Sequence, residues 1–356
     1  MPENFGNMEK PIIGITTGDL NGIGIETIIK VFSDTRMLDF CCPVIYGSNK
    51  VLNFYRKALP DYQFNFTSIK KLDQLNPKQV NVFNCWEEDV QIKPGELSET
   101  GGKYAVRSLQ VATYSLQAGE INALVTAPIH KKNTQLPDFP FTGHTPFLKH
   151  TFQADDVVMM LYAGDFRVAL ITEHIPINEV SKVLSQELII KRISMVRQSL
   201  QRDFGIDAPK IAVLGLNPHA GDNGLIGQEE ELIIKPAMEH LHQKGFHVFG
   251  PYSADGFFAH SHQNKFDVVV AMYHDQGLIP FKSLAVSEGV NYTIGLPVVR
   301  TSPDHGTAFD IAGQGLANPD SLREAVYEAI NILRHRAEYD ERTANPLKRN
   351  TLAKER

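Results

Sequence analysis

Three histidines each follow an apolar run of the kind that forms a buried strand. His174 ends the segment VALITEH, His219 follows IAVLGLNPH and His274 follows VVVAMYH. The carboxyl ends of parallel strands share one edge of a sheet, so residues far apart in sequence can meet there. Three imidazoles with an open coordination position bind a catalytic divalent metal, typically zinc. Because the spacings of 45 and 55 residues match no local metal motif, hydrogen-bonded structural histidines are the alternative interpretation.

A second group of polar residues could bind an anion. In FTGHTPF, His144 and Thr145 lie where a helix is predicted to begin, and free backbone amides at a helix start can bind an anion. A helix cap by Thr145 is the competing interpretation. Lys282, Asn291 and Arg300 come near the ends of later apolar runs. Lysine and arginine there suit carboxylate or phosphate recognition, with solvated surface positions as the alternative.

Two glycine-rich segments precede predicted helices, TTGDLNGIGIE (16–26) and GLNPHAGDNGLIGQEE (215–230). The first matches neither GxGxxG nor GxxxxGKS/T, so neither the Rossmann nor the P-loop mechanism of phosphate binding is indicated. Each segment is either a tight turn or a helix start that faces a ligand. Asn217 near His219 and Asp275 beside His274 are candidates for orienting these histidines.

Short apolar runs that alternate with helical patterns position these residues. Strands are predicted within 11–19, 42–48, 123–128, 157–164, 166–174, 210–221 and 266–276, and helices over 23–32, 99–119, 185–203, 228–244 and 320–338. β-Branched runs separated by helices indicate an α/β fold with a parallel or mixed sheet covered on both faces. The polar segment after residue 338 is expected to be partly disordered.

Length and composition exclude several classes of protein. The chain has 356 residues, a hydrophobic fraction of 42% and a formal net charge of −6. This length suggests two domains or one large unit with two lobes, and the negative charge argues against general nucleic-acid binding. Three cysteines without a CxxC pair indicate neither a disulfide framework nor a thiolate zinc site. Without a signal-like segment or a membrane-spanning apolar run, we expect no membrane partner and a cytoplasmic location.

No linker rich in proline, glycine or serine separates independent modules. We therefore expect the chain to pass between two lobes near residues 130–140 and to return near 285–300. The predicted lobes are residues 1–135 together with 290–356, and residues 136–289.

Six segments between residues 14 and 313 together resemble the 4-hydroxythreonine-4-phosphate dehydrogenase family of vitamin B6 biosynthesis. They are GDLNGIGIE, TAPIHK, FTGHT, LNPHAGDNGLIGQEE, AMYHDQGLIPFK and GLPVVRTSPDHGTAFDIAG. The segment 305–319, HGTAFDIAGQGLANP, is also similar to the loop that holds the adenosine end of the nicotinamide cofactor in isopropylmalate and isocitrate dehydrogenases. The resemblance implies a two-lobed α/β/α sandwich of the isocitrate/isopropylmalate dehydrogenase-like type, without a Rossmann domain.

The resemblance also implies a role for individual residues and for each lobe. One zinc, magnesium or cobalt ion would be bound by His174, His219 and His274. Substrate would be bound by His144, Thr145, Lys282, Asn291 and Arg300. NAD or NADP would be bound by His305, Gly306, Thr307, Ala308 and Asn318. The candidates for proton transfer are Lys282, Asp255 and Asp275. The first lobe would hold the cofactor, and the second would carry the metal ligands and form a homodimer whose active site is shared between subunits.

The implied reaction is metal-dependent oxidation of 4-phosphooxy-L-threonine by NAD or NADP, followed by decarboxylation to 3-amino-2-oxopropyl phosphate. Four positions depart from the family pattern: His130, Pro146, Asp222 and Pro303. Because Pro146 follows GHT, where an acidic residue is usual, a sister dehydrogenase for threonate or erythronate 4-phosphate or for a dihydrodiol is the first alternative. A metal-dependent hydrolase and a catalytically silent binding protein are alternatives from other classes.

Overall fold

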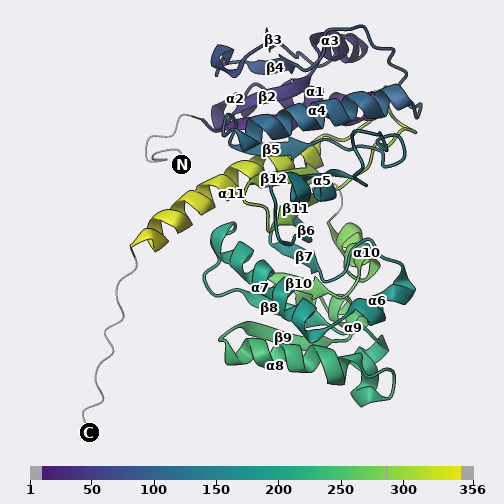
Figure 1. The fold of residues 1–356 in the computed structure, drawn as a ribbon, viewed down its shortest axis with the longest axis vertical. Coiled ribbons are helices and arrows are strands. Elements are labelled where there is room, and N and C mark those ends of the chain that lie inside the picture. Colours follow the sequence, from purple (N-terminus) through teal and green to yellow (C-terminus); the bar gives the residue numbers. More distant parts are fainter. Residues whose placement is uncertain (1–9, 286–287, 346–356) are drawn as a thin grey trace.

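The computed structural model of the chain describes residues 10–285 and 288–345, which fold around one twelve-stranded sheet. The strand order is β3-β4-β2-β1-β5-β12-β11-β6-β7-β10-β8-β9, and Figure 1 shows these strands following one another along the long axis of the molecule. The strands are β1 (Ile12–Thr16), β2 (Cys42–Gly47), β3 (Phe66–Ile69), β4 (Val80–Asn84), β5 (Ala123–Thr126), β6 (Val158–Ala163), β7 (Phe166–Leu170), β8 (Lys210–Leu214), β9 (His247–Tyr252), β10 (Val268–Ala271), β11 (Val290–Ile294) and β12 (Val299–Pro303).

The helices pack against this sheet. They are α1 (Gly24–Phe32), α2 (Met37–Phe40), α3 (Asn49–Ala58), α4 (Glu99–Gln117), α5 (His144–Thr151), α6 (Ile177–Val183), α7 (Gln186–Arg202), α8 (Lys235–Gln243), α9 (Ala254–Ala259), α10 (His274–Leu284) and α11 (Asp320–Ala344). Short 3-10 segments are η2 (Leu72–Gln74), η3 (Pro218–Gly224) and η5 (His262–Lys265), and η4 (Glu230–Ile234) is a π-helical turn. Serine side chains cap helices α4 and α7, because Ser98 accepts from the amide of Gly101 and Ser185 from that of Leu188.

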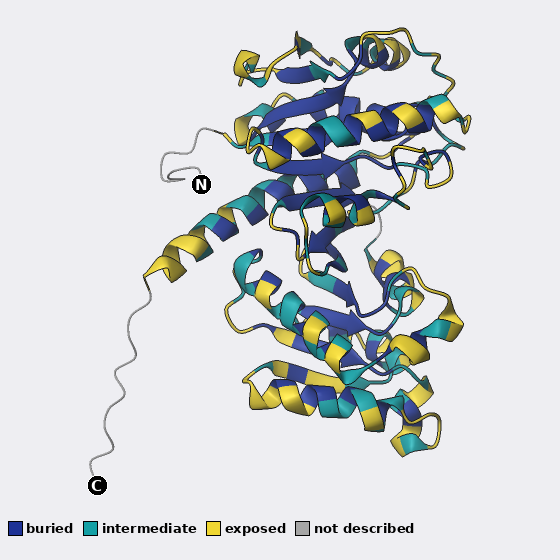
Figure 2. Cartoon of the chain, viewed as in Figure 1, coloured by how far each residue is buried: buried dark blue, intermediate teal, exposed yellow. Residues whose placement is uncertain are grey.

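The apolar runs of the sequence become the buried centre of the sheet. All four residues of β5 and of β10 are buried, and Figure 2 shows the strands as the most buried part of the molecule. Around this centre, α4 contacts β1, β2 and β5, α11 contacts β5, β11 and β12, and α10 contacts β6, β7 and β10. The predicted α/β fold class is confirmed.

The sheet is mixed, and its strand directions change in the middle. β11 is antiparallel to both β12 and β6, and β6 is antiparallel to β7, while the remaining neighbours run parallel. Parallel strands of opposite direction therefore occupy the two ends of one continuous sheet. The lobe boundaries at residues 135 and 290 stay a prediction.

Several predicted elements end earlier or later than the sequence suggested. The strands predicted within 166–174, 210–221 and 266–276 end at Leu170, Leu214 and Ala271, and the helix predicted over 228–244 is a π-turn followed by α8. The last helix runs to Ala344 rather than to residue 338, so the expected disorder is wrong for residues 339–344; residues 346–356 lie outside the described part. Within that part, no helix combines the length and the apolar character needed to cross a membrane.

Candidate active site

The three predicted metal ligands lie at one edge of the sheet. Strands β7, β10 and β8 are parallel neighbours in that order, so their carboxyl ends are adjacent. His174 comes four residues after β7, and His274 is the first residue of α10, three residues after β10. His219 lies in η3, which follows β8. The topology thus gathers side chains that are separated by about a hundred residues of chain.

Two of these histidines face each other, and the third lies in an adjoining cavity. The ring centres of His174 and His274 are 5.7 Å apart, and both line a cavity of about 480 Å³. His219 lines a second cavity of about 300 Å³ together with Asp255, and Tyr273 borders both cavities. Among residues 10–285 and 288–345, no three His, Cys, Asp or Glu side chains lie in a geometry that could hold a metal. The ligand role of the triad stays a prediction.

The chemistry of the donor set nevertheless fits a divalent metal. Burial lowers the pKa of His174, and the neighbouring positive charge of Lys131 lowers it further, which favours the neutral imidazole that coordinates metals. Nδ1 of His274 is 2.7 Å from a carboxylate oxygen of Asp275. A carboxylate on one ring nitrogen orients the other nitrogen for ligation, which is the role that the sequence predicted for Asp275.

His219 lies in a turn with left-handed backbone geometry. Its φ is 53°, and the next four residues have φ values of 51°, 78°, 42° and 56°. Only Gly221 among these five is a glycine. Since a left-handed conformation costs roughly 1–2 kcal/mol for each non-glycine residue, surrounding contacts must hold this turn. Backbone strain of this kind concentrates at functional sites.

The Arg300 side chain is the clearest candidate for binding an anion. It is 3% exposed, and its guanidinium donates to the hydroxyls of Thr126, at 2.6 and 3.0 Å, and of Thr293, at 3.1 Å. Within the described residues, no carboxylate lies within ion-pair distance of it. Burial lowers the pKa of Arg300 to about 10. A buried cation without an anionic partner indicates that the partner is a ligand.

The imidazole of His144 belongs to the same group. His144 is the first residue of α5, and its Nε2 atom is buried without a hydrogen-bond partner. Burial lowers the pKa of His144 well below its ordinary value, and the charge of Arg300 adds to this effect. A buried ring nitrogen without a hydrogen-bond partner and a buried guanidinium without a carboxylate together suit a polar, anionic ligand. Thr145 follows in the first turn of α5 and is partly exposed, without capping the helix by its side chain.

The amino group of Lys282 lies near the start of the predicted cofactor loop. Its Nζ donates to the carbonyl of Asp304 at 3.3 Å, and its charge helps to lower the pKa of His305, which burial lowers most. Nε2 of His305 and Oδ1 of Asn291 are both buried without partners. Since Asn291 pairs with Ser302 across β11 and β12, this end of the sheet adjoins the segment that leads into the loop.

The predicted cofactor loop rests on the first glycine-rich segment. The carbonyl of Thr307 accepts from the amide of Ile23 at 3.0 Å, and a Cβ atom at Gly22 would come within 2.9 Å of that carbonyl oxygen. Glycine at position 22 therefore permits the close approach of the two segments. At the other end of the loop, Oδ1 of Asn318 accepts from the amide of Asp320, the first residue of α11. Of the remaining predicted positions, Gly306 directly precedes the first contact and Ala308 directly follows it.

The three candidates for proton transfer occupy different surroundings. Lys282 and Asp275 are exposed and lie on α10, near its end and its start respectively. Asp255 is on α9 in the cavity of His219 and accepts from the hydroxyl of Ser253 at 2.5 Å. That hydrogen bond lowers the pKa of Asp255. The structure does not bring these three groups together.

Sequence reasoning missed two residues of α1 that hold the end of the predicted cofactor loop. Lys30 and Glu26 are buried on α1 and form an ion pair of 3.0 Å. Lys30 donates to the carbonyls of Gly315 and Ala317, and Glu26 accepts from the amide of Ala317. The signal for this anchor was a Glu and a Lys four residues apart within an otherwise apolar helix. Glu230, at the start of η4, carried no such signal.

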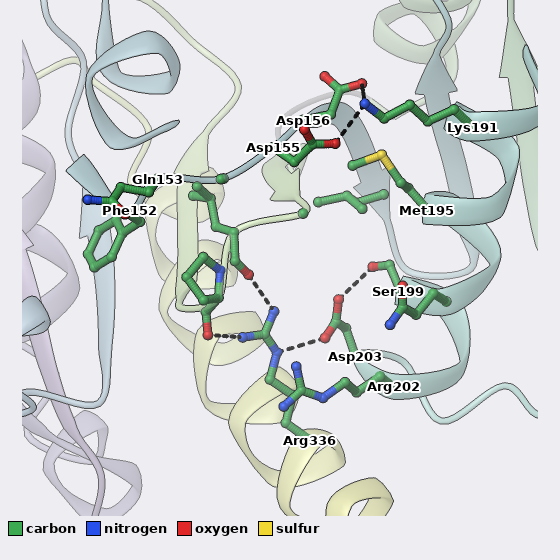
Figure 3. Close-up of a pocket in the computed structure, with 16 residues that line it drawn as sticks. Phe152, Gln153, Asp155, Asp156, Lys191, Met195, Ser199, Arg202, Asp203 and Arg336 are labelled. Carbon is green, nitrogen blue, oxygen red and sulfur yellow. Dashed lines mark hydrogen bonds and ion pairs between the residues drawn. The ribbon is translucent and has the colours of Figure 1, made fainter. Parts of the chain in front are cut away.

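A further cavity of the described chain lies away from these residues. It measures about 500 Å³ and is lined by α7, the segment 152–156, the β11–β12 connection and Arg336 of α11 (Figure 3). Its charged groups are paired: Arg336 with Asp203 at 2.7 Å, and Lys191 with Asp155 at 2.8 Å. None of the predicted site residues lines it. The unpaired polar atoms, rather than the size of a cavity, locate the candidate site.

Comparison with known proteins gives a consistent result. The model of the family described as pyridoxal phosphate biosynthetic protein PdxA matches residues 39–329. The chain is 48% identical to the 4-hydroxythreonine-4-phosphate dehydrogenase of Bacteroides thetaiotaomicron, over 95% of this chain and 93% of that protein. The crystal structure of 4-hydroxythreonine-4-phosphate dehydrogenase from Klebsiella pneumoniae superposes with a TM-score of 0.79 at 36% identity, covering 92% of this chain and 99% of that one.

A more distant solved structure is that of a dehydrogenase named for a different type of substrate. The terephthalate 1,2-cis-dihydrodiol dehydrogenase of Burkholderia xenovorans LB400 superposes with a TM-score of 0.59 at 27% identity and covers 91% of this chain and 98% of that one. The extent of the family match and the 48% identity over nearly the whole length decide the family. The chain belongs to the family of the pyridoxal phosphate biosynthetic protein PdxA, as the sequence motifs predicted.

Proposed function

We propose that the chain is a 4-hydroxythreonine-4-phosphate dehydrogenase of pyridoxine 5′-phosphate biosynthesis. It oxidises the C3 hydroxyl of 4-phosphooxy-L-threonine, with transfer of hydride to NAD or NADP and release of one proton. The resulting β-keto acid loses CO2 and gives 3-amino-2-oxopropyl phosphate. The names of the relatives and the family support this assignment.

The observation that carries the proposal is the pair formed by Arg300 and His144. A guanidinium that is buried without a carboxylate requires an anion for compensation. The unpartnered Nε2 of His144 supplies a further polar contact. Bidentate recognition by arginine suits a phosphate or a carboxylate, and the substrate has both. Asn291 and Thr145 would complete the set through neutral hydrogen bonds.

His174, His219 and His274 would hold one zinc, magnesium or cobalt ion. When bound, this ion supplies positive charge beside the oxygen atom on which negative charge develops during both steps. The imidazoles contribute neutral ligands, and Asp275 fixes the orientation of His274 through the contact with Nδ1.

Lys282, Asp255 and Asp275 remain the candidates for accepting the hydroxyl proton. Hydrogen bonding from Ser253 lowers the pKa of Asp255 and so makes it a weaker base for a direct transfer. The loop 305–318 would hold NAD or NADP through His305, Gly306, Thr307, Ala308 and Asn318. Hydrogen bonds from Ile23 to Thr307 and from Lys30 to Ala317 keep the backbone of this segment in place before the cofactor binds.

A homodimer with a shared active site would cover the edge of the sheet at which His174, His219 and His274 lie. Ile177 on α6 is 68% exposed, and Ile279 and Leu284 on α10 are 65% and 55% exposed. These apolar side chains border the elements that carry His174 and His274. Exposed apolar groups on neighbouring elements are typical of a protein interface. Sedimentation of the purified protein would test the dimer directly.

The test of the function is nicotinamide reduction with 4-phosphooxy-L-threonine, with added zinc or magnesium and with chelator. We expect metal-dependent reduction, with kcat/KM lowered about 10²- to 10⁴-fold in R300M. Threonate and erythronate 4-phosphates, tested in parallel, examine the alternative suggested by Pro146. Faster reduction with either of them would transfer the assignment to a sister dehydrogenase, and nicotinamide binding without any reduction would contradict the redox assignment.

A further inference from the structure

Glu230 is a carboxylate that lies at the centre of the loop carrying His219. It is fully buried, and within the described residues it has no lysine, arginine or histidine within ion-pair distance. Its Oε1 accepts from the backbone amides of Leu216 and Asn217, each at 2.7 Å, and its Oε2 accepts from Nδ2 of Asn217 at 2.8 Å. These three donors compensate a buried carboxylate that no cation neutralises.

The loop closes tightly around this carboxylate. A Cβ atom at Gly215 would lie 3.0 Å from Oε1 of Glu230, and one at Gly221 would lie 2.6 Å from Oε2. Side chains are therefore absent where the loop passes Glu230 on both sides. Glu230 itself begins the π-helical turn η4, a local widening of the helix that is frequent at functional sites.

The left-handed turn begins two residues after Asn217, the second of the two residues whose amides donate to Glu230. Asn217 is two residues before His219, the first of five residues with positive φ, and Gly221, the third, faces the other carboxylate oxygen. Glu230 thus contacts the loop before and within the turn. Without these contacts, the non-glycine residues of the turn would relax to the right-handed or extended conformations that they favour.

A second connection joins this loop to the start of α10. Nε2 of Gln276 donates to the carbonyl of Gly215 at 2.6 Å, and Oε1 of Gln276 accepts from the amide of Met272 at 2.7 Å. His274 lies between Met272 and Gln276 in the chain. The loop of His219 and the helix start of His274 are therefore fixed relative to each other.

We propose that Glu230 is a positioning residue for the metal site, which holds the left-handed turn and with it the imidazole of His219. This proposal rests on the proposed function, because it assumes that His219 is a ligand. Loss of the carboxylate should release the turn and remove one of three protein ligands. Groups that orient metal ligands typically contribute a factor of about 10–100 to metal affinity.

The first test compares E230Q with E231Q in the full-length protein. Glu231 is the next residue of the same π-turn, but its carboxylate pairs with Lys235 and, among the described residues, accepts no hydrogen bond from the loop. Isothermal titration with cobalt should show a dissociation constant raised about 10- to 100-fold in E230Q and unchanged within about twofold in E231Q. Weak binding should also change the visible absorption of bound cobalt, because a ligand is lost, while the KM for the nicotinamide cofactor stays unchanged.

A second pair of variants tests the turn without altering Glu230. G221A places a Cβ against the carboxylate, whereas at Gly224 the nearest atom to an added Cβ is 3.9 Å away. Both glycines have strongly positive φ, 78° and 88°, so the pair is matched for backbone strain. We expect G221A to weaken cobalt binding in the same way as E230Q, and G224A to retain it.

The outcomes separate the two proposals. If the unchanged protein binds no divalent metal, the metal premise of the proposed function fails. If the unchanged protein binds cobalt and the folded E230Q binds it equally well, the role of Glu230 is refuted. Should E230Q fail to fold, G221A against G224A decides: equal cobalt affinity in these two would refute the role, and a selective loss in G221A would support it.

Discussion

Replacing Arg300 with methionine should remove activity at little cost to stability. Burial lowers the pKa of the guanidinium from 12.5 to about 10, and at about 1.4 kcal/mol per pKa unit the charged form is penalised by roughly 3 kcal/mol. Methionine removes this penalty and keeps most of the volume. It also removes three hydrogen bonds to the hydroxyls of Thr126 and Thr293, each contributing about 1 kcal/mol. The two effects offset each other, so the free energy of unfolding should change by less than about 2 kcal/mol.

The effect on catalysis should be much larger. Two charge-assisted hydrogen bonds to a bound anion contribute about 1.5–3 kcal/mol each, or roughly 3–6 kcal/mol together. Since about 1.4 kcal/mol corresponds to a tenfold change, kcat/KM should fall by about 10²- to 10⁴-fold. The assay is nicotinamide reduction with 4-phosphooxy-L-threonine, and urea unfolding of the same preparation measures stability.

Arg336 provides a control, because it is also a buried arginine but lies outside the site. Its guanidinium is paired with Asp203 at 2.7 Å and contacts the hydroxyl of Tyr292 at 3.0 Å. R336M leaves a buried carboxylate unpaired and should destabilise the protein by about 3–5 kcal/mol, with kcat/KM near that of the unchanged enzyme. The reasoning is refuted if R300M loses stability like R336M while its folded fraction keeps kcat/KM within tenfold of the unchanged enzyme.

Three further expectations can be measured on purified protein. The pKa of His144 is lowered in the folded state, so the unfolded state takes up the proton first as the pH falls through about 6.5. The free energy of unfolding should therefore decrease by up to about 1.4 kcal/mol per pH unit as the pH falls below that value. Urea unfolding between pH 7.5 and 5.5 should show a smaller decrease in H144Q. H274A should reduce metal-dependent turnover by at least about 100-fold with an unchanged melting temperature, and turnover at the original rate after exhaustive chelation would exclude a metal-dependent reaction. K30M removes both bonds to the loop at Gly315 and Ala317 and should raise the KM for the nicotinamide cofactor about 10-fold, with little change in the KM for the phosphorylated substrate.

The sequence predicted those parts of the site that follow from sheet topology. His174, His219 and His274 could be grouped from sequence because each follows an apolar run, and parallel neighbours place such ends on one edge. The start of α5 at His144 was also predicted, because glycine precedes it and the helical pattern follows. These predictions depend on local pattern together with one general rule of chain geometry.

The remaining features depend on contacts between distant segments. The burial of Arg300 results from its position on β12 between β5 and β11, and no local pattern gives that neighbourhood. The left-handed turn at His219 was hidden because four of its five residues are not glycine. The short strand β3 and the largely exposed edge strand β9 lack the continuous apolar run of central strands, so both escaped prediction.

Helix α11 connects the loop proposed to hold the cofactor with the end of α7. At the start of α11, its first amide donates to Asn318, at the end of the loop proposed to hold the cofactor. Near its other end, Arg336 pairs with Asp203 and Asp340 pairs with Arg202, both at the end of α7. A straight helix of 25 residues spans roughly 37 Å. Any relative rotation of the two halves of the sheet would therefore strain the contacts at one end of α11 or the other, which couples the loop proposed to hold the cofactor to the end of α7.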